Sequence, residues 1–506
     1  MRFRVMMGRS VIGQIARRVG ARPSALTRRE FLLSSLAAGA SLMLADRNRG
    51  ALAKAAAPRV VIIGAGFSGL SCAYQLQRSG ARVTVLEARP RVGGRVHSLD
   101  TLLPGKKVEA GAELIGLIHS TWLAYAKQFG LSLNELPESD EAQSPILLNG
   151  RRLLGSEVKK LWGALDTTLQ SMNAAARTIN GQRPWLSPNA ALLDGQSLKQ
   201  AAERWPGSPL ERQAAMVMIA NDMNCLPDRF SYLAMLAAIA AAGVETFWSE
   251  SENFRCATGN QSLAFALSGA IGEANIQLRS PVAAIDLSGR TARVTLQSGS
   301  VLEADAVVLT APPSTWDELR VTPAIPANYR MSTGTAIKLL NRVDQPFWNA
   351  ENLAPDSLTD GAVGMTWRGG EPAASSPKEA ACLTVFSGGQ AAQPWLDSNP
   401  GQRQKLANQQ LEILYPGFSK HSQQTIFCGW PLERWSRCGY SAPSPGQVTK
   451  VLPLLEAGWQ DKLFFAGEYN SPGFYGYMEG GLHSGALLAG RLARQFNLID
   501  QQRPAG

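Results

Sequence analysis

The 506-residue sequence has few of the side chains that build metal or nucleophile sites. It contains four histidines and six cysteines, and no two cysteines form a Cys-x-x-Cys pair. No Gly-x-Ser-x-Gly elbow and no His-Glu-x-x-His motif occurs in it. These absences argue against a zinc site, a thioredoxin-like redox centre, a serine hydrolase and a zinc protease. The cysteine spacing leaves open whether one or two disulfides form.

Excess charge is missing from most of the chain. The net charge is +10, but the first 57 residues carry eleven basic and two acidic side chains and account for +9. The other 449 residues carry 39 basic and 38 acidic side chains. We therefore expect no nucleic-acid partner for the folded part. The length and an apolar content of 45% predict a globular protein of two domains.

The chain also lacks an apolar run long enough to span a bilayer. Residues 31–45 are mostly apolar, but 15 residues fall short of the roughly 20 needed. This run follows Arg28-Arg29, an order that resembles a twin-arginine signal peptide with cleavage after Ala53 or Ala57. We expect residues 1–57 to engage the twin-arginine export machinery, which carries folded proteins, and the mature protein to be periplasmic or secreted. An uncleaved N-terminal arm is the alternative.

A dinucleotide-binding motif opens the mature chain. The β-branched run at residues 59–63 leads into GAGFSG at 64–69, a helical pattern follows, and a second strand ends in an acid. The glycines permit a tight turn, close approach of a pyrophosphate and close helix–strand packing, and the acid can bind ribose hydroxyls. A glycine-rich turn without a ligand is the alternative. The residues expected to contact the dinucleotide are Gly64, Gly66, Ser68, Gly69 and Glu87.

A second glycine pair, flanked by arginines, follows at residues 88–96 (ARPRVGGRV). A nicotinamide dehydrogenase does not need it, whereas a longer dinucleotide running past the second strand would use it. With VIIGAGFSGL before it, the segment resembles the FAD-dependent amine oxidase family, which includes monoamine, polyamine and L-amino-acid oxidases. The resemblance implies FAD as the cofactor and contacts to it from Ala88, Arg89, Gly94 and Arg95.

Three later segments resemble the same family. Residues 108–113 resemble the segment beside the flavin ring, 280–313 the meander that returns to the FAD domain, and 463–481 the C-terminal FAD-binding segment. The resemblance covers about residues 58–496 and is weakest over 116–255. It implies further FAD contacts from Gly111, Ala112, Glu113, Val282, Gly467, Glu468, Gly476, Tyr477 and Met478.

The resemblance also implies catalytic residues. Lys338 lies in an alternating, strand-like segment before QPFW at 345–348. The alternation alone favours an outward-facing lysine on a half-buried strand, whereas the family spacing implies a lysine that holds a water against flavin N5. Tyr477 matches one wall of an aromatic slot for the amine. Tyr440 is our candidate for the opposite wall, and Trp435 competes with it.

The implied reaction is hydride transfer from an amine or L-amino acid to FAD N5. The imine product then hydrolyses to a carbonyl compound and ammonia. Because only one Gly-x-Gly-x-x-Gly occurs, we expect no NAD(P)H site, and electrons leave to oxygen, giving hydrogen peroxide, or to another acceptor. Monoamine oxidases attach flavin through a cysteine near the position of Cys438. The Gly-Gly-Cys-Tyr pattern is missing here, so we expect non-covalent FAD.

The substrate is less defined. An amino-acid oxidase needs a cation for the carboxylate, and the candidates are Arg151, Arg152, Arg255 and Arg368, each of which could equally be a surface arginine. We lean slightly towards an L-amino acid or primary amine over an alkaloid or polyamine. The alternatives are a flavin desaturase or porphyrinogen-type oxidase acting on a large apolar substrate, and a non-catalytic exported FAD-binding assembly factor.

The predicted fold is α/β. A doubly wound, Rossmann-like FAD-binding domain is interleaved with an α+β substrate domain of mixed sheet and helices. The expected FAD segments are 58–115, 256–325 and 436–496, and the substrate segments are 116–255 and 326–435. Residues 497–506 form a tail. The oligomeric state stays open, a homodimer included.

Overall fold

A computed structural model describes residues 57–136, 142–370 and 379–499 of the chain. The predicted export segment lies outside these ranges except for Ala57. Within them, no helix is both long and apolar enough to cross a membrane, and no group of three metal-ligating side chains gathers. All six cysteines fall in the described ranges, and none is in a disulfide.

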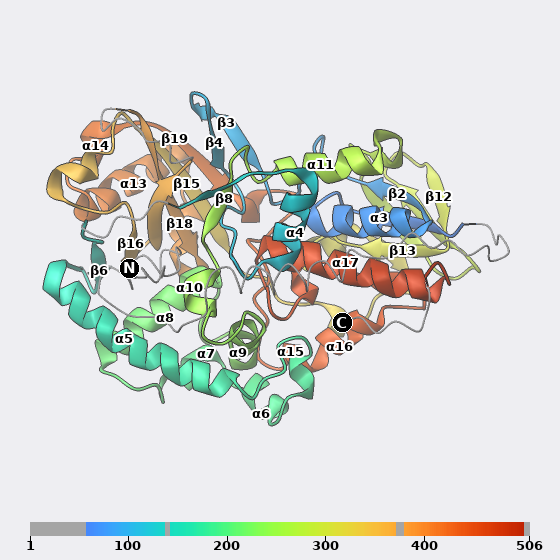
Figure 1. Ribbon diagram of the computed structural model, residues 1–506, viewed down its shortest axis with the longest axis horizontal. Coiled ribbons are helices and arrows are strands. Elements are labelled where there is room, and N and C mark those ends of the chain that lie inside the picture. Colours follow the sequence, from blue (N-terminus) through green and yellow to red (C-terminus); the bar gives the residue numbers. More distant parts are fainter. Residues whose placement is uncertain (1–56, 137–141, 371–378, 500–506) are drawn as a thin grey trace, which may run out of the picture.

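A five-stranded, fully parallel sheet organises one half of the molecule (Figure 1). Its central strand is a run of β-branched residues that is buried on both faces, as expected for a parallel sheet. The strands, in spatial order, are β20 (Leu463–Phe465), β13 (Ala306–Leu309), β1 (Arg59–Ile63), β2 (Arg82–Leu86) and β9 (Ile276–Gln277).

Helices cover one face of this sheet and a β-meander covers the other. Val60 and Ile62 of β1 pack with the helices, whereas Val61 and Ile63 share a cluster with the meander. The helices are α3 (Phe67–Ser79), α4 (Ser120–Phe129), α11 (Ser262–Ile271) and α17 (Met478–Gln495). The meander sheet contains β12 (Val301–Ala304), β11 (Ala292–Leu296), β10 (Val282–Asp286) and β14 (Arg320–Thr322).

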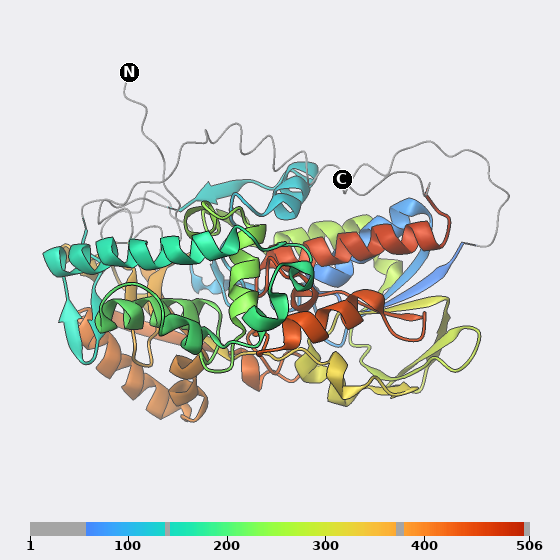
Figure 2. The ribbon, with the colours of Figure 1, turned by 90° about the horizontal axis from the view of Figure 1, so that it is seen from below.

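A seven-stranded mixed sheet organises the other half, and the two halves lie side by side along the long axis (Figures 1 and 2). In spatial order its strands are β19 (Ser422–Gly429), β15 (Ala336–Val343), β18 (Ala381–Gly388), β17 (Met365–Gly369), β16 (Ser357–Thr359), β6 (Ile146–Leu148) and β7 (Arg151–Leu153). The main helices of this half are α5 (Gly155–Ala176), α8 (Pro209–Asp222), α9 (Tyr232–Ala241) and α13 (Pro400–Leu414).

The two halves alternate along the chain. Strands of the parallel sheet come from residues 59–86, 276–309 and 463–465, and strands of the mixed sheet come from the stretches between them. Two small two-stranded sheets complete the fold. The hairpin of β3 (Ser98–Leu103) and β4 (Lys106–Glu109) is local, whereas β5 (Leu133–Glu135) pairs with the distant β8 (Phe254–Cys256). The predicted α/β class, a Rossmann-like sheet interleaved with a mixed-sheet domain, is confirmed.

Candidate active site

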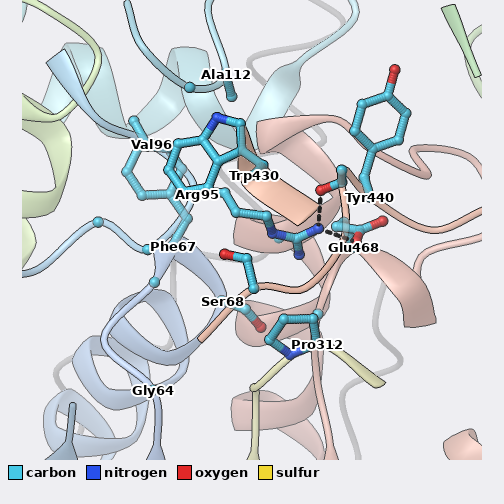
Figure 3. A pocket seen from close by; sticks show the side chains of 18 of the residues that line it. Gly64, Phe67, Ser68, Arg95, Val96, Ala112, Pro312, Trp430, Tyr440 and Glu468 are labelled. Carbon is cyan, nitrogen blue, oxygen red and sulfur yellow. Dashed lines mark hydrogen bonds and ion pairs between the residues drawn. The ribbon is translucent and has the colours of Figure 1, made fainter. Parts of the chain in front are cut away.

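One large cavity lies between the two sheets. It opens to solvent, and the empty space within it is about 2060 Å³ when the open region is counted. Both halves of the molecule line it, and the figure shows part of the lining (Figure 3). The predicted site residues in its wall are Gly64, Gly66, Ser68, Glu87, Ala88, Arg89, Gly94, Arg95, Gly111, Ala112, Glu113, Val282, Lys338, Tyr440, Gly467, Glu468, Gly476, Tyr477 and Met478.

The turn between β1 and α3 forms one end of the cavity. Gly64 has a φ of +108°, and a Cβ there would lie 2.5 Å from Thr310 Oγ1. Gly69 is the one residue predicted to contact FAD that does not line the cavity. A Cβ on it would lie 1.9 Å from the Gly64 carbonyl oxygen, so its lack of a side chain lets α3 pack against the strand.

The N-terminus of α3 points to an anion site in this wall. Its N-cap, Gly66, provides no side-chain cap, and Phe67, Ser68 and Gly69 of the first turn are buried. Buried N–H groups at a helix start need acceptors, and a phosphate supplies them. A Cβ on Gly94 would lie 3.3 Å from Gly66 Cα, so two glycine loops meet here.

Glu87 at the end of β2 is fixed by the backbone around it. Its carboxylate accepts from the N–H groups of Ala65 and Arg89, both at 2.8 Å. Arg89 in turn donates to the Ser436 hydroxyl at 2.9 Å and pairs with Glu433. These contacts order the loop that, with Val282, would hold the adenosine part of a dinucleotide.

Arg95 and Glu468 form an ion pair in the cavity wall (Figure 3). Arg95 Nη1 lies 2.9 Å from a Glu468 oxygen and donates to the Gly439 carbonyl at 2.9 Å. Glu468 also accepts from the Gly476 N–H at 2.9 Å. Burial alone would lower the pKa of Arg95, but the neighbouring Glu468 carboxylate raises it, so Arg95 stays cationic.

Lys338 lies in the cavity wall and is only 5% exposed. The outward-facing lysine favoured by strand alternation is therefore wrong. Its Nζ lies 2.6 Å from Glu113 Oε2, and Arg255 Nε lies 2.7 Å from the other Glu113 oxygen. The Glu113 carboxylate lies between these two cations, and Glu113, predicted to contact FAD, lines the cavity.

Tyr440 and Tyr477 both line the cavity and lie near each other. The Tyr440 hydroxyl donates to the Asp222 carbonyl, and a Cβ on Gly476 would lie 2.4 Å from the Tyr440 ring. Tyr477 makes an edge contact with His119 at 5.2 Å between ring centroids. Burial, and then nearby carboxylates, raise the pKa of both tyrosines well above 10, so both stay neutral. The competing candidate Trp435 lines the cavity too.

Asp222 and Glu252 also line the cavity, and sequence reasoning missed both. Asp222 ends α8 and Glu252 follows a short helix, and neither stands in a motif that would have selected it. After burial, their charges are the largest causes of the raised pKa of Tyr440 and Tyr477, so both lie near these rings. Burial raises the pKa of Asp222 itself to about 7.

The four arginines considered for a substrate carboxylate do not line the cavity. Arg255 is engaged with Glu113. Arg151 pairs with Glu157 on the surface, where both side chains are largely exposed. The expectation that one of these arginines holds a substrate carboxylate therefore has no support from the geometry.

Cys438 is buried but does not line the cavity, although its neighbour Gly439 does. Its Sγ lies 3.9 Å from Arg95 Nη1. The thiol thus faces the arginine side of its loop, an arrangement that favours non-covalent binding of a flavin.

The lining residues fit FAD. The uncapped helix start and crowded glycines suit a pyrophosphate, and Glu87 lies where a ribose would bind. Lys338 and the two tyrosines line the same cavity, where an isoalloxazine and a small substrate would bind.

Comparison with known proteins agrees with this geometry. The profile of flavin containing amine oxidoreductases matches residues 67–493, and that of pyridine nucleotide-disulphide oxidoreductases matches residues 20–101. A probable flavin-containing monoamine oxidase A of Dictyostelium discoideum is 23% identical over 445 residues, which cover 84% of this chain and 95% of the relative. An L-amino acid dehydrogenase of a Synechocystis species is 24% identical over 460 residues, covering 85% and 93%.

The fold has solved counterparts. Cyclohexylamine oxidase from Brevibacterium oxydans superposes with a TM-score of 0.77 at 23% identity, covering 87% of this chain and all of that one. The family match favours amine oxidation over the desaturase and assembly-factor alternatives. The chain thus belongs to the flavin-containing amine oxidoreductase family and is an FAD-dependent enzyme that oxidises amines.

Proposed function

We propose that the enzyme acts on amines without a carboxylate and prefers those with a second positive charge. The observation that carries this proposal is the pair of carboxyl groups, Asp222 and Glu252, in the cavity wall beside Tyr440 and Tyr477. Ionised carboxyl groups attract an ammonium and repel a carboxylate at close range, and Asp222, whose pKa is about 7, adds its full charge above that pH. The absence from this wall of the four candidate arginines supports the same substrate class.

The side chains of the cavity wall have distinct tasks in the proposal. Tyr440 and Tyr477 remain neutral and offer aromatic faces that orient the amine, and the hydrogen bond from Tyr440 to the Asp222 carbonyl fixes its ring. Lys338 presents a buried ammonium to the same space. FAD, when bound, accepts the hydride that the substrate carbon loses.

A matched set of three substrates tests the proposal. L-Lysine differs from 1,5-diaminopentane by a carboxylate, and pentylamine differs from it by the second amine. We expect kcat/KM for the diamine to exceed that for L-lysine at least about 100-fold, because a carboxylate near two acidic groups costs several kcal/mol. Pentylamine should fall between them. Equal or faster turnover of L-lysine would contradict the proposal.

A variant tests whether the carboxyl pair causes the preference for a diamine. Glu252→Gln should reduce the ratio of kcat/KM for diaminopentane to kcat/KM for pentylamine, mainly by raising KM for the diamine. Glu303→Gln is the matched control, because Glu303 is in a surface ion pair with Arg59 and does not line the cavity. An unchanged ratio in Glu252→Gln would remove Glu252 from substrate selection.

We also infer that the chain is exported in folded form. The Arg28-Arg29 pair, the apolar run that follows and the confinement of +9 to residues 1–57 support this inference. Replacing both arginines with lysine should remove the protein from the periplasmic or secreted fraction of the cells that make it. The matched control is Arg47→Lys with Arg49→Lys, which keeps the paired arginines. Unchanged fractionation of the first variant would contradict export by this route.

A further inference from the structure

Arg255, Glu113 and Lys338 form a continuous chain of buried charges at the cavity. The links are 2.7 Å from Arg255 to Glu113 and 2.6 Å from Glu113 to Lys338. The exposed fractions of the three residues are 4%, 5% and 5%. The chain joins β8, the segment after β4 and strand β15, so no single sequence motif contains it.

Arg255 is held as a fixed anchor. Its Nη1 donates to the Gly370 carbonyl at 3.1 Å and its Nη2 to the Arg368 carbonyl at 2.8 Å, both at the end of β17. Its Nε faces Glu113. Two of its nitrogens are thus fixed by backbone carbonyls, and the contact from Nε to Glu113 is an ion pair without hydrogen-bond geometry. The fixed guanidinium therefore places a positive charge beside the Glu113 carboxylate.

Glu113 is ionised at neutral pH. Burial alone would raise its pKa, but the Lys338 ammonium and the Arg255 guanidinium together hold that pKa below its usual range. Lys338 donates to this carboxylate and, at 3.2 Å, to the Glu109 carbonyl. An ammonium has three N–H donors, so one remains for the cavity that Lys338 lines.

We propose that Glu113, beside Arg255, is a positioning residue that fixes the direction of the Lys338 side chain at the cavity and supplies its buried counter-charge. The inference rests on a role for Lys338 in amine oxidation. It gives Glu113 an effect on the reaction that passes through Lys338 rather than through contact with FAD or substrate.

Other titratable groups surround Lys338 on every packed element. The Glu109 carboxyl group at the end of β4 has a pKa raised to about 7 by burial. The thiols of Cys382 on β18 and Cys428 on β19 have pKa values raised by burial to about 12 and 11. Glu113 is therefore the ionised partner in direct contact with Lys338. Without it, Lys338 would face Arg255 with only a partly ionised Glu109 nearby, and a buried lysine without a counter-charge loses its proton at lower pH.

The first test is the pH dependence of flavin reduction by 1,5-diaminopentane, followed without oxygen. Glu113→Gln should slow this step at least about 10-fold at pH 7, because positioning errors carry costs of this order or larger. It should also change the pH dependence of this step, because burial disfavours a lysine charge that has lost its counter-charge. Glu113→Asp should restore the wild-type pH profile, and the surface variant Glu303→Gln should match wild type.

The second test asks whether Glu113 acts through Lys338. The double variant Glu113→Gln with Lys338→Met should reduce flavin no more slowly than Lys338→Met alone. In FAD-free protein, Glu113→Gln should lower the melting temperature, and adding Lys338→Met should raise it again by removing an uncompensated buried charge. If Glu113→Gln does not retain FAD, Arg255→Met can replace it in the kinetic comparison. Arg255→Met should slow flavin reduction in the wild-type background and should have no further effect in the Lys338→Met background.

A wild-type pH profile in Glu113→Gln would overturn the positioning role. A double variant whose loss in rate is the product of the losses in Glu113→Gln and Lys338→Met would overturn it as well. Turnover of the diamine by the wild-type enzyme in the same series would show that amine oxidation itself stands. An unaffected Lys338→Met variant would instead remove Lys338, and with it the role assigned to Glu113.

Discussion

Lys338 owes its position to the alternation of strand β15. Ile337 and Leu339 pack into a cluster with helix α13, so the lysine between them faces the opposite side. There it meets Glu113, 225 residues away in the sequence. The ammonium also lies 5.4 Å from the centroid of the Trp367 ring. A buried lysine is tolerated when its charge is paired in this way.

The substitution Lys338→Met tests this residue directly. We expect FAD content to stay at the wild-type level, because Met is of similar length and the glycine loops that suit the diphosphate are untouched. The rate of flavin reduction by amine should fall on the order of 100-fold, through lost positioning and proton handling at the cavity. Stopped-flow absorbance measures it, with the exposed Lys420→Met as control. A wild-type rate in Lys338→Met would contradict the assignment.

Cys438 bears on how the flavin is held. Because its thiol faces Arg95 and does not line the cavity, we expect acid precipitation to release all of the FAD into the supernatant. Cys438→Ser should bind FAD as the wild type does. Yellow colour remaining in the washed precipitate of the wild type, and absent from that of Cys438→Ser, would show a covalent bond.

The buried carboxyl group of Glu109 should make the stability of the protein depend on pH. Burial raises its pKa from 4.5 to about 7, opposed by hydrogen bonds from Asn260 and Ser98. Because the folded-state pKa is the higher one, this contribution to stability is complete below pH 4.5 and is lost as the pH rises through 7. The shift corresponds to about 3 kcal/mol at most.

The variant Glu109→Gln should lack this pH dependence of stability, because its amide does not ionise. Between pH 4.5 and 7 the free energy of unfolding of the wild type should fall relative to that of Glu109→Gln, as denaturant titrations at several pH values would measure. Parallel curves for the two proteins over this range would show that Glu109 is not the group responsible.

At the scale of elements, the β1–α3 turn depends on close backbone packing that is possible only because glycines lie at the contacts. The first turn of α3 packs on the strand through Gly69, and α17 packs on α3 through Gly485, where a Cβ would lie 2.2 Å from the Ser68 carbonyl oxygen. These contacts hold the helix start against the cavity. The glycine spacing predicts the turn, because its physical requirement is local.

Two glycine substitutions separate packing from intrinsic helix propensity. Gly69→Ala should destabilise the fold by about 1–3 kcal/mol and weaken FAD binding, since its Cβ would overlap the Gly64 carbonyl. Gly163→Ala in α5 has open space around the new methyl group and should stabilise by about 0.5–1 kcal/mol. Denaturant unfolding and FAD titration of both variants provide the measurements. Equal effects from the two substitutions would contradict the packing argument.

The element scale also shows where sequence reasoning ends. The motifs around Gly64, Arg95 and Glu468 predict their places in the cavity wall because each lies in a short, patterned segment. Asp222 and Glu252 come from the least patterned stretch of the chain, and tertiary packing alone brings them to the tyrosines. Their contribution becomes visible only once the cavity is built.

At the scale of the whole molecule, the cavity exists because two sheets alternate along the chain. Segments far apart in sequence meet where the parallel sheet adjoins the seven-stranded one (Figure 1). The fold class follows from the dinucleotide motif and the family resemblance. The ion-pair chain through Glu113 does not, because its partners are contributed by three distant segments whose register is set by tertiary packing.

The most direct measurement mixes the purified, FAD-loaded protein with 1,5-diaminopentane in the absence of oxygen and follows the flavin absorbance. Loss of the band near 450 nm is expected at a rate that saturates with amine, since the substrate would bind beside Lys338, Tyr440 and Tyr477 before it reacts. L-Lysine at the same concentrations should leave the band almost unchanged over that time. A band that persists with the diamine and other alkylamines, or that L-lysine bleaches faster, would contradict amine oxidation at this cavity as described.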